Sequence, residues 1–158
     1  MKLVEGLLLK DQLKKEASQL RELISKCCQA QSGDKPPFEV NELFAEYEEL
    51  KMAEMKVSRE IQITNNIIKF KYWDIDEERT MTQALADLSS ISDNLYFVDK
   101  MIKGGIITYS WSSKEIRDIS YVDVVKYQNK LKELRSKEYE LKRRIQFANY
   151  EFDLIESK

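Results

Sequence analysis

Apolar residues recur along most of this chain at alternating steps of three and four positions, which is the spacing of one face of an α-helix. The longest such stretch covers residues 120–155. Its apolar positions are Val124, Tyr127, Leu131, Leu134, Leu141, Ile145, Ala148, Phe152 and Ile155. Glu138 is the single polar interruption. The pattern predicts a long final helix that lies along other helices and whose apolar face serves burial alone.

The same spacing predicts three earlier helices, over residues 3–29, 41–68 and 80–103. The first presents Leu9, Leu13, Ala17, Leu20, Ile24 and Cys27; the second presents Leu43, Tyr47, Leu50, Val57, Ile61 and Ile68; the third presents Met81, Leu85, Leu88, Leu95, Val98 and Ile102. Pro36-Pro37 separates the first two helices, because proline fixes its own φ and disfavours helix in the preceding residue. Thr80 with Gln83 forms a capping-box pattern that opens the third helix, and Gly104-Gly105 predicts its end.

Residues 106–119 have a different composition, rich in β-branched and aromatic side chains, which is typical of a small β-hairpin. By contrast, residues 70–78 read as a connection between the second and third helices. Four helices with short connections most simply alternate in direction. The expected fold is therefore all-α, an antiparallel four-helix bundle with a small β-hairpin between helices 3 and 4, as a single domain over residues 1–158.

The composition excludes many enzyme classes, because none of the 158 residues is histidine. Histidine is the commonest general base, the usual partner of a serine or cysteine nucleophile, and the commonest imidazole metal ligand. Phosphate-binding and nucleophile-elbow glycine motifs are also missing from the sequence. Catalysis by carboxylates alone would need Asp87, Glu60 and Asp123 to meet in a cleft, whereas such acids are usually solvated. We expect no enzyme activity, no metal and no cofactor.

The sequence predicts a cytoplasmic protein without a membrane span, since no apolar run approaches the roughly 20 residues that a spanning helix needs. The formal net charge of −2 is too small to favour nucleic acid or membrane as a partner. Adjacent Cys27 and Cys28 suit neither a long-range disulfide nor a zinc site without histidine.

Polar residues gather near the expected ends of three helices, and an antiparallel bundle could bring them to one end. They are Thr64, Asn65, Asn66, Thr80, Gln146 and Asn149. Such amides and hydroxyls could bind a small ligand or ion. More often they satisfy unpaired backbone groups at helix ends, which is the interpretation we favour.

Several short segments together resemble a family of small bacterial helical proteins labelled septicolysin-like, nearly from end to end. The segments are Met1-Lys2-Leu3, Glu5-Gly6-Leu7, Ile63-Thr64-Asn65, Thr80-Met81-Thr82-Gln83-Ala84-Leu85-Ala86, Tyr109-Ser110, Glu115-Ile116, Val122-Asp123-Val124, Arg144-Ile145-Gln146 and Ala148-Asn149-Tyr150. The family carries an arginine-rich acidic pair where this chain has Asp87-Leu88-Ser89, so any role of that pair does not carry over. The resemblance implies an all-α, self-associating bacterial protein, and the family label implies a cytolysin.

Two classes of function remain, and we favour an interaction or assembly protein that forms homo-oligomers and could also bind another protein. At about 1.5 Å per residue, a helix over residues 120–155 would be about 54 Å long and would overhang the third helix, of about 36 Å. The overhang would expose an apolar patch for a second copy, namely Phe147, Tyr150, Phe152, Leu154 and Ile155. The alternative is a nucleic-acid or membrane binder that uses the basic run Lys142-Arg143-Arg144, although neighbouring glutamates dilute its charge.

Overall fold

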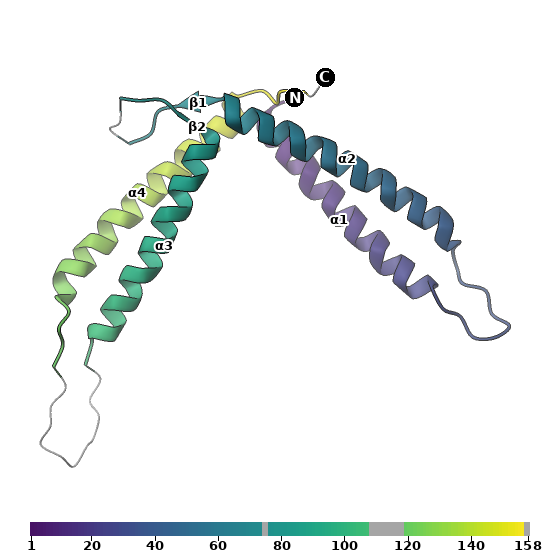
Figure 1. The fold of residues 1–158 in the computed structure, drawn as a ribbon, viewed down its shortest axis with the longest axis horizontal. Coiled ribbons are helices and arrows are strands. Elements are labelled where there is room, and N and C mark those ends of the chain that lie inside the picture. The colour runs from purple at the N-terminus through teal and green to yellow at the C-terminus, as the bar shows by residue number, and fades with distance from the viewer. Residues whose placement is uncertain (74–75, 108–118, 157–158) are drawn as a thin grey trace, which may run out of the picture. The chain divides into compact units, whose positions relative to one another are not determined.

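The structure is a computed structural model that describes residues 1–73, 76–107 and 119–156. Within these ranges the helices are α1 (Leu3–Cys27), α2 (Val40–Ile67), α3 (Met81–Gly105) and α4 (Val124–Glu151), in the expected order (Figure 1). Strands β1 (Lys69–Phe70) and β2 (Arg79–Thr80) pair antiparallel, Lys69 with Thr80 and Phe70 with Arg79. The protein is therefore all-α with a small two-stranded sheet.

The sheet lies between α2 and α3, in the segment that the sequence pattern treats as a plain connection. Two residues from each side of this connection form the ladder. The β-hairpin expected over residues 106–119 falls mainly on residues 108–118, which lie outside the described residues.

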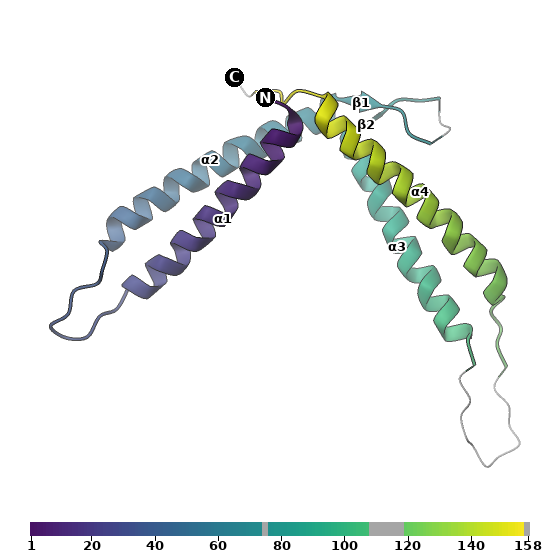
Figure 2. The ribbon, with the colours of Figure 1, turned by 180° about the vertical axis from the view of Figure 1, so that it is seen from behind.

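The chain divides into two compact units, residues 1–68 with 148–158 and residues 69–147. The first, unit 1, is built on α1 and α2, which lie side by side and run antiparallel (Figures 1 and 2). Several of its buried apolar side chains come from the predicted faces, among them Ala17, Cys27, Val57 and Ile61. The second, unit 2, is built on α3 and most of α4. Whether the units form a single domain stays a prediction.

Unit 2 has its own core between α3 and α4. Val98 and Ile102 pack with Leu131 and Leu134. Glu138 interrupts the apolar face of α4 as predicted, and its Oε1 accepts hydrogen bonds from Ser92 Oγ at 3.1 Å and from Lys142 Nζ at 2.8 Å. The bond to Lys142 lowers the pKa of the Glu138 carboxyl. Ser92 is exposed, so water could replace it at the Glu138 carboxylate, and this bond contributes little to the register of α4 against α3.

Helix α3 begins as predicted but does not bury every predicted position. The capping box is confirmed, since Gln83 N–H donates to Thr80 Oγ1 and Thr80 N–H donates to Gln83 Oε1. The predicted inward position of Leu85 is wrong, because its side chain is exposed, whereas Ala84 and Ile91 are buried.

The prediction of one helix from residue 120 to residue 155 is also wrong. Helix α4 has 28 residues and α3 has 25, or about 42 Å and about 38 Å at about 1.5 Å per residue, so the expected overhang is small. Asp123 begins α4 by accepting a hydrogen bond from Lys126 N–H. The chain leaves the helix after Glu151 because the next residues bond to the N-terminus instead.

The C-terminal segment, residues 152–156, pairs with the start of the chain inside unit 1. Leu3 N–H, an otherwise unpaired donor in the first turn of α1, donates to Phe152 O at 3.0 Å, and Leu154 N–H donates to Met1 O at 2.8 Å. The Leu154 side chain packs over Gly6, where an added Cβ would lie 3.0 Å from Leu154 Cδ2. These contacts bury Leu3 and Leu154 completely or nearly so.

Candidate functional site

The predicted polar cluster divides between the two units. Thr64, Asn65, Asn66 and Asn149 belong to unit 1, whereas Thr80 and Gln146 belong to unit 2. Thr80 serves as the cap of α3, and Gln146 is exposed on α4. The capping interpretation therefore holds for Thr80, and a shared ligand site formed by all six residues stays a prediction.

Thr64 has the most constrained position in this set. Its side chain is fully buried, and its hydroxyl donates to Glu60 O at 2.8 Å and accepts from Ile155 N–H at 2.9 Å. One hydroxyl thus joins the end of α2 to the C-terminal segment. The role is structural, because both hydrogen-bonding directions of the hydroxyl are used within the protein.

The predicted C-terminal interface is only partly available to a second molecule. Phe147 and Tyr150 are exposed, but Leu154 is buried within unit 1, and Phe152 and Ile155 are partly buried there. The reason is the exit of the chain from α4 at Glu151, which folds three of the five side chains back against their own molecule. The patch as predicted from an overhanging helix is not formed.

An aromatic and charged cluster in unit 2 was missed by the sequence pattern. Tyr72 is buried, and its hydroxyl donates to Asp87 Oδ2 at 2.6 Å; Arg79 Nη1 donates to the same oxygen at 2.6 Å. Burial, followed by the hydrogen bond to Asp87, raises the pKa of the Tyr72 hydroxyl from 10.0 to about 12. Asp87 is therefore engaged by two donors and anchors the β1–β2 connection to α3.

The same connection is fixed to α4 by two further bonds. Trp73, whose φ of 53° lies in the left-handed region, donates from Nε1 to Lys137 O at 3.2 Å. Arg144 Nε donates to Lys71 O at 3.0 Å, and its guanidinium lies 5.7 Å from the centroid of the Phe70 ring. The sequence signal for this packing was the presence of three aromatic residues within four positions, namely Phe70, Tyr72 and Trp73.

The carboxylates considered for catalysis have separate structural roles. Asp87 binds Arg79 and Tyr72, while Asp123 caps the opposite end of unit 2 at the start of α4. Glu60 is buried in unit 1. Across residues 1–73, 76–107 and 119–156, no three histidine, cysteine, aspartate or glutamate side chains are grouped to hold a metal ion.

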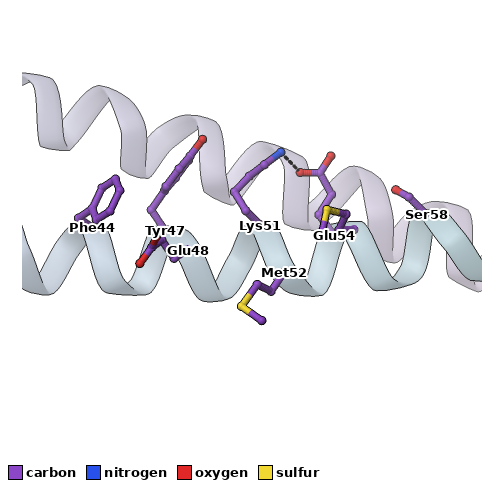
Figure 3. Close-up of a pocket in the computed structure, with 8 residues that line it drawn as sticks. Phe44, Tyr47, Glu48, Lys51, Met52, Glu54 and Ser58 are labelled. Carbon is purple, nitrogen blue, oxygen red and sulfur yellow. Dashed lines mark hydrogen bonds and ion pairs between the residues drawn. The ribbon is translucent and has the colours of Figure 1, made fainter. Parts of the chain in front are cut away.

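A groove of about 530 Å³ lies along α2, lined entirely by residues of that helix. The lining residues are Phe44, Tyr47, Glu48, Lys51, Met52, Glu54, Met55 and Ser58 (Figure 3). Exposed fractions of 49% for Phe44, 69% for Met52 and 65% for Met55 are high for large apolar side chains. Lys51 Nζ lies 2.5 Å from Glu54 Oε2, and this bond raises the pKa of Lys51.

This groove is the strongest candidate for a functional surface. Phe44, Met52 and Met55 lie off the face that packs on α1, so the helical periodicity of the buried face does not select them, whereas it does select Tyr47. The available signal was three large apolar residues, Phe44, Met52 and Met55, left over on one helix after its buried face had been assigned.

Comparisons with other proteins place the chain among proteins of undescribed activity. A crystal structure of a functionally unknown conserved protein from Corynebacterium diphtheriae matches with a TM-score of 0.87 and 22% sequence identity, covering 98% of this chain and 99% of that chain. At this identity the likeness shows the fold alone. No curated protein matches the chain significantly. A family model matches residues 10–154, and the chain therefore belongs to the family of unknown function DUF6847.

Proposed function

We propose that this chain is a non-enzymatic assembly protein that binds other copies of itself through exposed helix faces. The observation that supports this proposal is the groove of α2, where Phe44, Met52 and Met55 are exposed together with Tyr47 beside them. Scattered exposed apolar residues are ordinary, but a contiguous apolar patch on a small protein is typical of an interaction site.

The chemistry of the side chains supports a role without catalysis. The sequence has no histidine, and the acids that a carboxylate mechanism would need are used elsewhere: Asp87 holds Arg79 and Tyr72, and Asp123 caps α4. A surface that binds another protein copy needs no general base. The absence of histidine and the structural roles of Asp87 and Asp123 are therefore compatible with an assembly role.

Contacts of the basic run favour assembly over the nucleic-acid or membrane alternative. Lys142 pairs with Glu138 at 2.8 Å, and Arg144 bonds to Lys71 O. Two of the three cations thus already hold partners within the chain, whereas phosphate contacts need cations that are free to displace counterions. Within the part of the chain that the structure describes, no helix is long and apolar enough to cross a membrane.

The proposal is tested by the absolute mass of the purified protein in solution. Light scattering between about 1 and 100 μM, a range that brackets micromolar affinity, should give a mass above the 18.7 kDa of one chain that rises with concentration. A mass of one chain at every concentration would contradict it. In parallel, filter binding to nucleic acid over a salt series and dye release from anionic vesicles should both be negative. The resemblance to septicolysin-like proteins and the cytoplasmic location stay predictions.

A further inference from the structure

Helix α2 carries large apolar side chains on two faces, and α1 packs on one of them. The covered face includes Leu43, Leu50, Val57 and Ile61, which are buried or partly buried. The second, which we name the outer α2 face, is Phe44, Glu48, Lys51, Met55 and Ser58, with Tyr47 and Met52 at its edges. Its five positions follow steps of four, three, four and three residues, the spacing by which a helix packs along another helix.

The outer α2 face is complementary to itself when its direction is reversed. Its central order is apolar, acidic, basic and apolar, as Phe44, Glu48, Lys51 and Met55. A two-fold axis placed midway between residues 49 and 50 exchanges Phe44 with Met55 and Glu48 with Lys51. Two identical helices running antiparallel across this axis therefore set Phe44 opposite the second copy's Met55, and Glu48 opposite its Lys51, each pair occurring twice. Lys51 already bonds to Glu54 of its own molecule, and its ammonium group has further N–H donors for the second copy's Glu48.

Both kinds of pair are favourable. A methionine sulfur beside an aromatic ring makes an attractive contact, and opposite charges facing each other across an interface fix register and direction. A parallel pairing would instead set Glu48 against Glu48 and Lys51 against Lys51, which is repulsive. The charge order on this face therefore favours the antiparallel arrangement, which also closes as a two-fold dimer in which the same patch meets itself.

We propose that α2 of one molecule packs antiparallel on α2 of a second copy, with the dimer axis passing between residues 49 and 50. This inference rests on the proposed assembly function and names its surface. Other occupants fit the face less well, because Glu48 and the Glu54 bonded to Lys51 leave the face without a positive excess. A nucleic acid or an anionic membrane would instead require a basic face.

A charge-swap series tests the pairing. Glu48→Lys sets like charges opposite Lys51 twice in each dimer, and Lys51→Glu does the same opposite Glu48. Each single variant should weaken dimerisation at least about tenfold, because two attractive pairs become repulsive. The double variant Glu48→Lys with Lys51→Glu should restore dimerisation toward wild type. Glu49→Lys is the matched control, since this substitution makes the same charge change at an exposed position on another side of α2.

Sedimentation equilibrium gives the dissociation constants, and circular dichroism checks that each variant keeps its helices. Equal dissociation constants for Glu48→Lys and Glu49→Lys would overturn the pairing. A double variant as weak as the single variants would also overturn it. If no variant changes the dissociation constant, the protein assembles through another surface and only the α2 pairing is wrong. A monomeric wild type would contradict both the assembly function and the α2 pairing.

Disulfide trapping tests the register directly. In a Cys27→Ala, Cys28→Ser background, one chain carries Phe44→Cys and the other carries Met55→Cys. Mixing and oxidation should link the two variants to each other. Phe44→Cys alone should not link, because residue 44 would lie about 17 Å along the axis from its copy, at about 1.5 Å per residue, beyond disulfide reach. Efficient linkage of Phe44→Cys to itself would show a parallel pairing and overturn the inference.

Discussion

Burial and a neighbouring carboxylate act together on the hydroxyl of Tyr72. Its hydroxyl donates to Asp87, which also accepts from Arg79, and the aromatic ring is enclosed in unit 2. Ionising the phenol would place a negative charge beside a carboxylate in a poorly solvated position. Both effects favour the neutral form, so the pKa of Tyr72 rises from 10.0 to about 12.

This pKa predicts a loss of stability at alkaline pH. The folded pKa is above the unfolded value, so the stabilisation is complete below pH 10 and declines as the pH rises from about 10 to about 12. Tyr72→Phe lacks the ionising group and should be less stable at neutral pH by about 1.5–3 kcal/mol, the usual value of a hydrogen bond to a charged group.

Urea unfolding at a series of pH values measures both effects. The difference in free energy of unfolding between wild type and Tyr72→Phe should narrow between pH 10 and pH 12. Tyr127→Phe, at a partly buried tyrosine on α4, is the control for losing a phenol. A difference that stays constant over this range would contradict the proposed link to ionisation.

Among the secondary-structure elements, the C-terminal segment shows how a non-local contact decides where a helix ends. Residues 152–155 continue the apolar spacing of α4, yet they leave the helix to bond with Met1, Leu3 and Thr64. The Thr64 hydroxyl is the contact between this segment and α2. Losing it would leave the Ile155 amide without its acceptor in a partly buried place.

Thr64→Val tests that contact, because valine has nearly the shape of threonine but no hydroxyl. It should lower the free energy of unfolding by about 1–3 kcal/mol and speed hydrogen exchange at the Ile155 amide. Thr64→Ser is the matched control, since it keeps the hydroxyl and loses one methyl group, at about 0.8 kcal/mol. Equal exchange rates at Ile155 in the two variants would show that the hydroxyl does not hold the segment.

Local periodicity predicts the helices well, and contacts distant in sequence explain what it misses. The faces containing Val57, Ile61, Leu131 and Leu134 are buried as expected, because an amphipathic helix must bury its apolar side. The exit of the chain after Glu151 depends on Met1, 153 positions before Leu154, and no local pattern encodes that pairing.

The candidate surface was equally hidden from the sequence pattern. Single apolar residues are common on the polar face of a helix. Phe44, Met52 and Met55 could therefore be recognised as a surface only once the face of α2 that packs on α1 was known. Tyr72 and Arg79 meet Asp87 only because the β1–β2 ladder closes the connection between them. The polar cluster at helix ends was predicted from one assumed bundle, whereas its members fall in two units.

At the scale of the whole molecule, the division into two units predicts where self-association should be felt. Helix α2 belongs to unit 1, as do α1 and the C-terminal segment, whereas α3 and most of α4 belong to unit 2. A second copy bound to α2 stabilises only those states in which α2 is folded. By mass action, a partner at about 100 times its dissociation constant adds about 2.7 kcal/mol to that state.

Hydrogen exchange at low and high protein concentration should therefore respond unequally along the chain. Amides of α1, α2 and residues 148–156 should exchange more slowly at high concentration, whereas amides of α3 should not change, because local opening of unit 2 leaves α2 folded. Glu48→Lys should remove the concentration dependence, and Glu49→Lys should keep it. Equal slowing in both units would mean that the units open together or that the contact between copies lies elsewhere; slowing confined to α3 and α4 would place the assembly surface on unit 2.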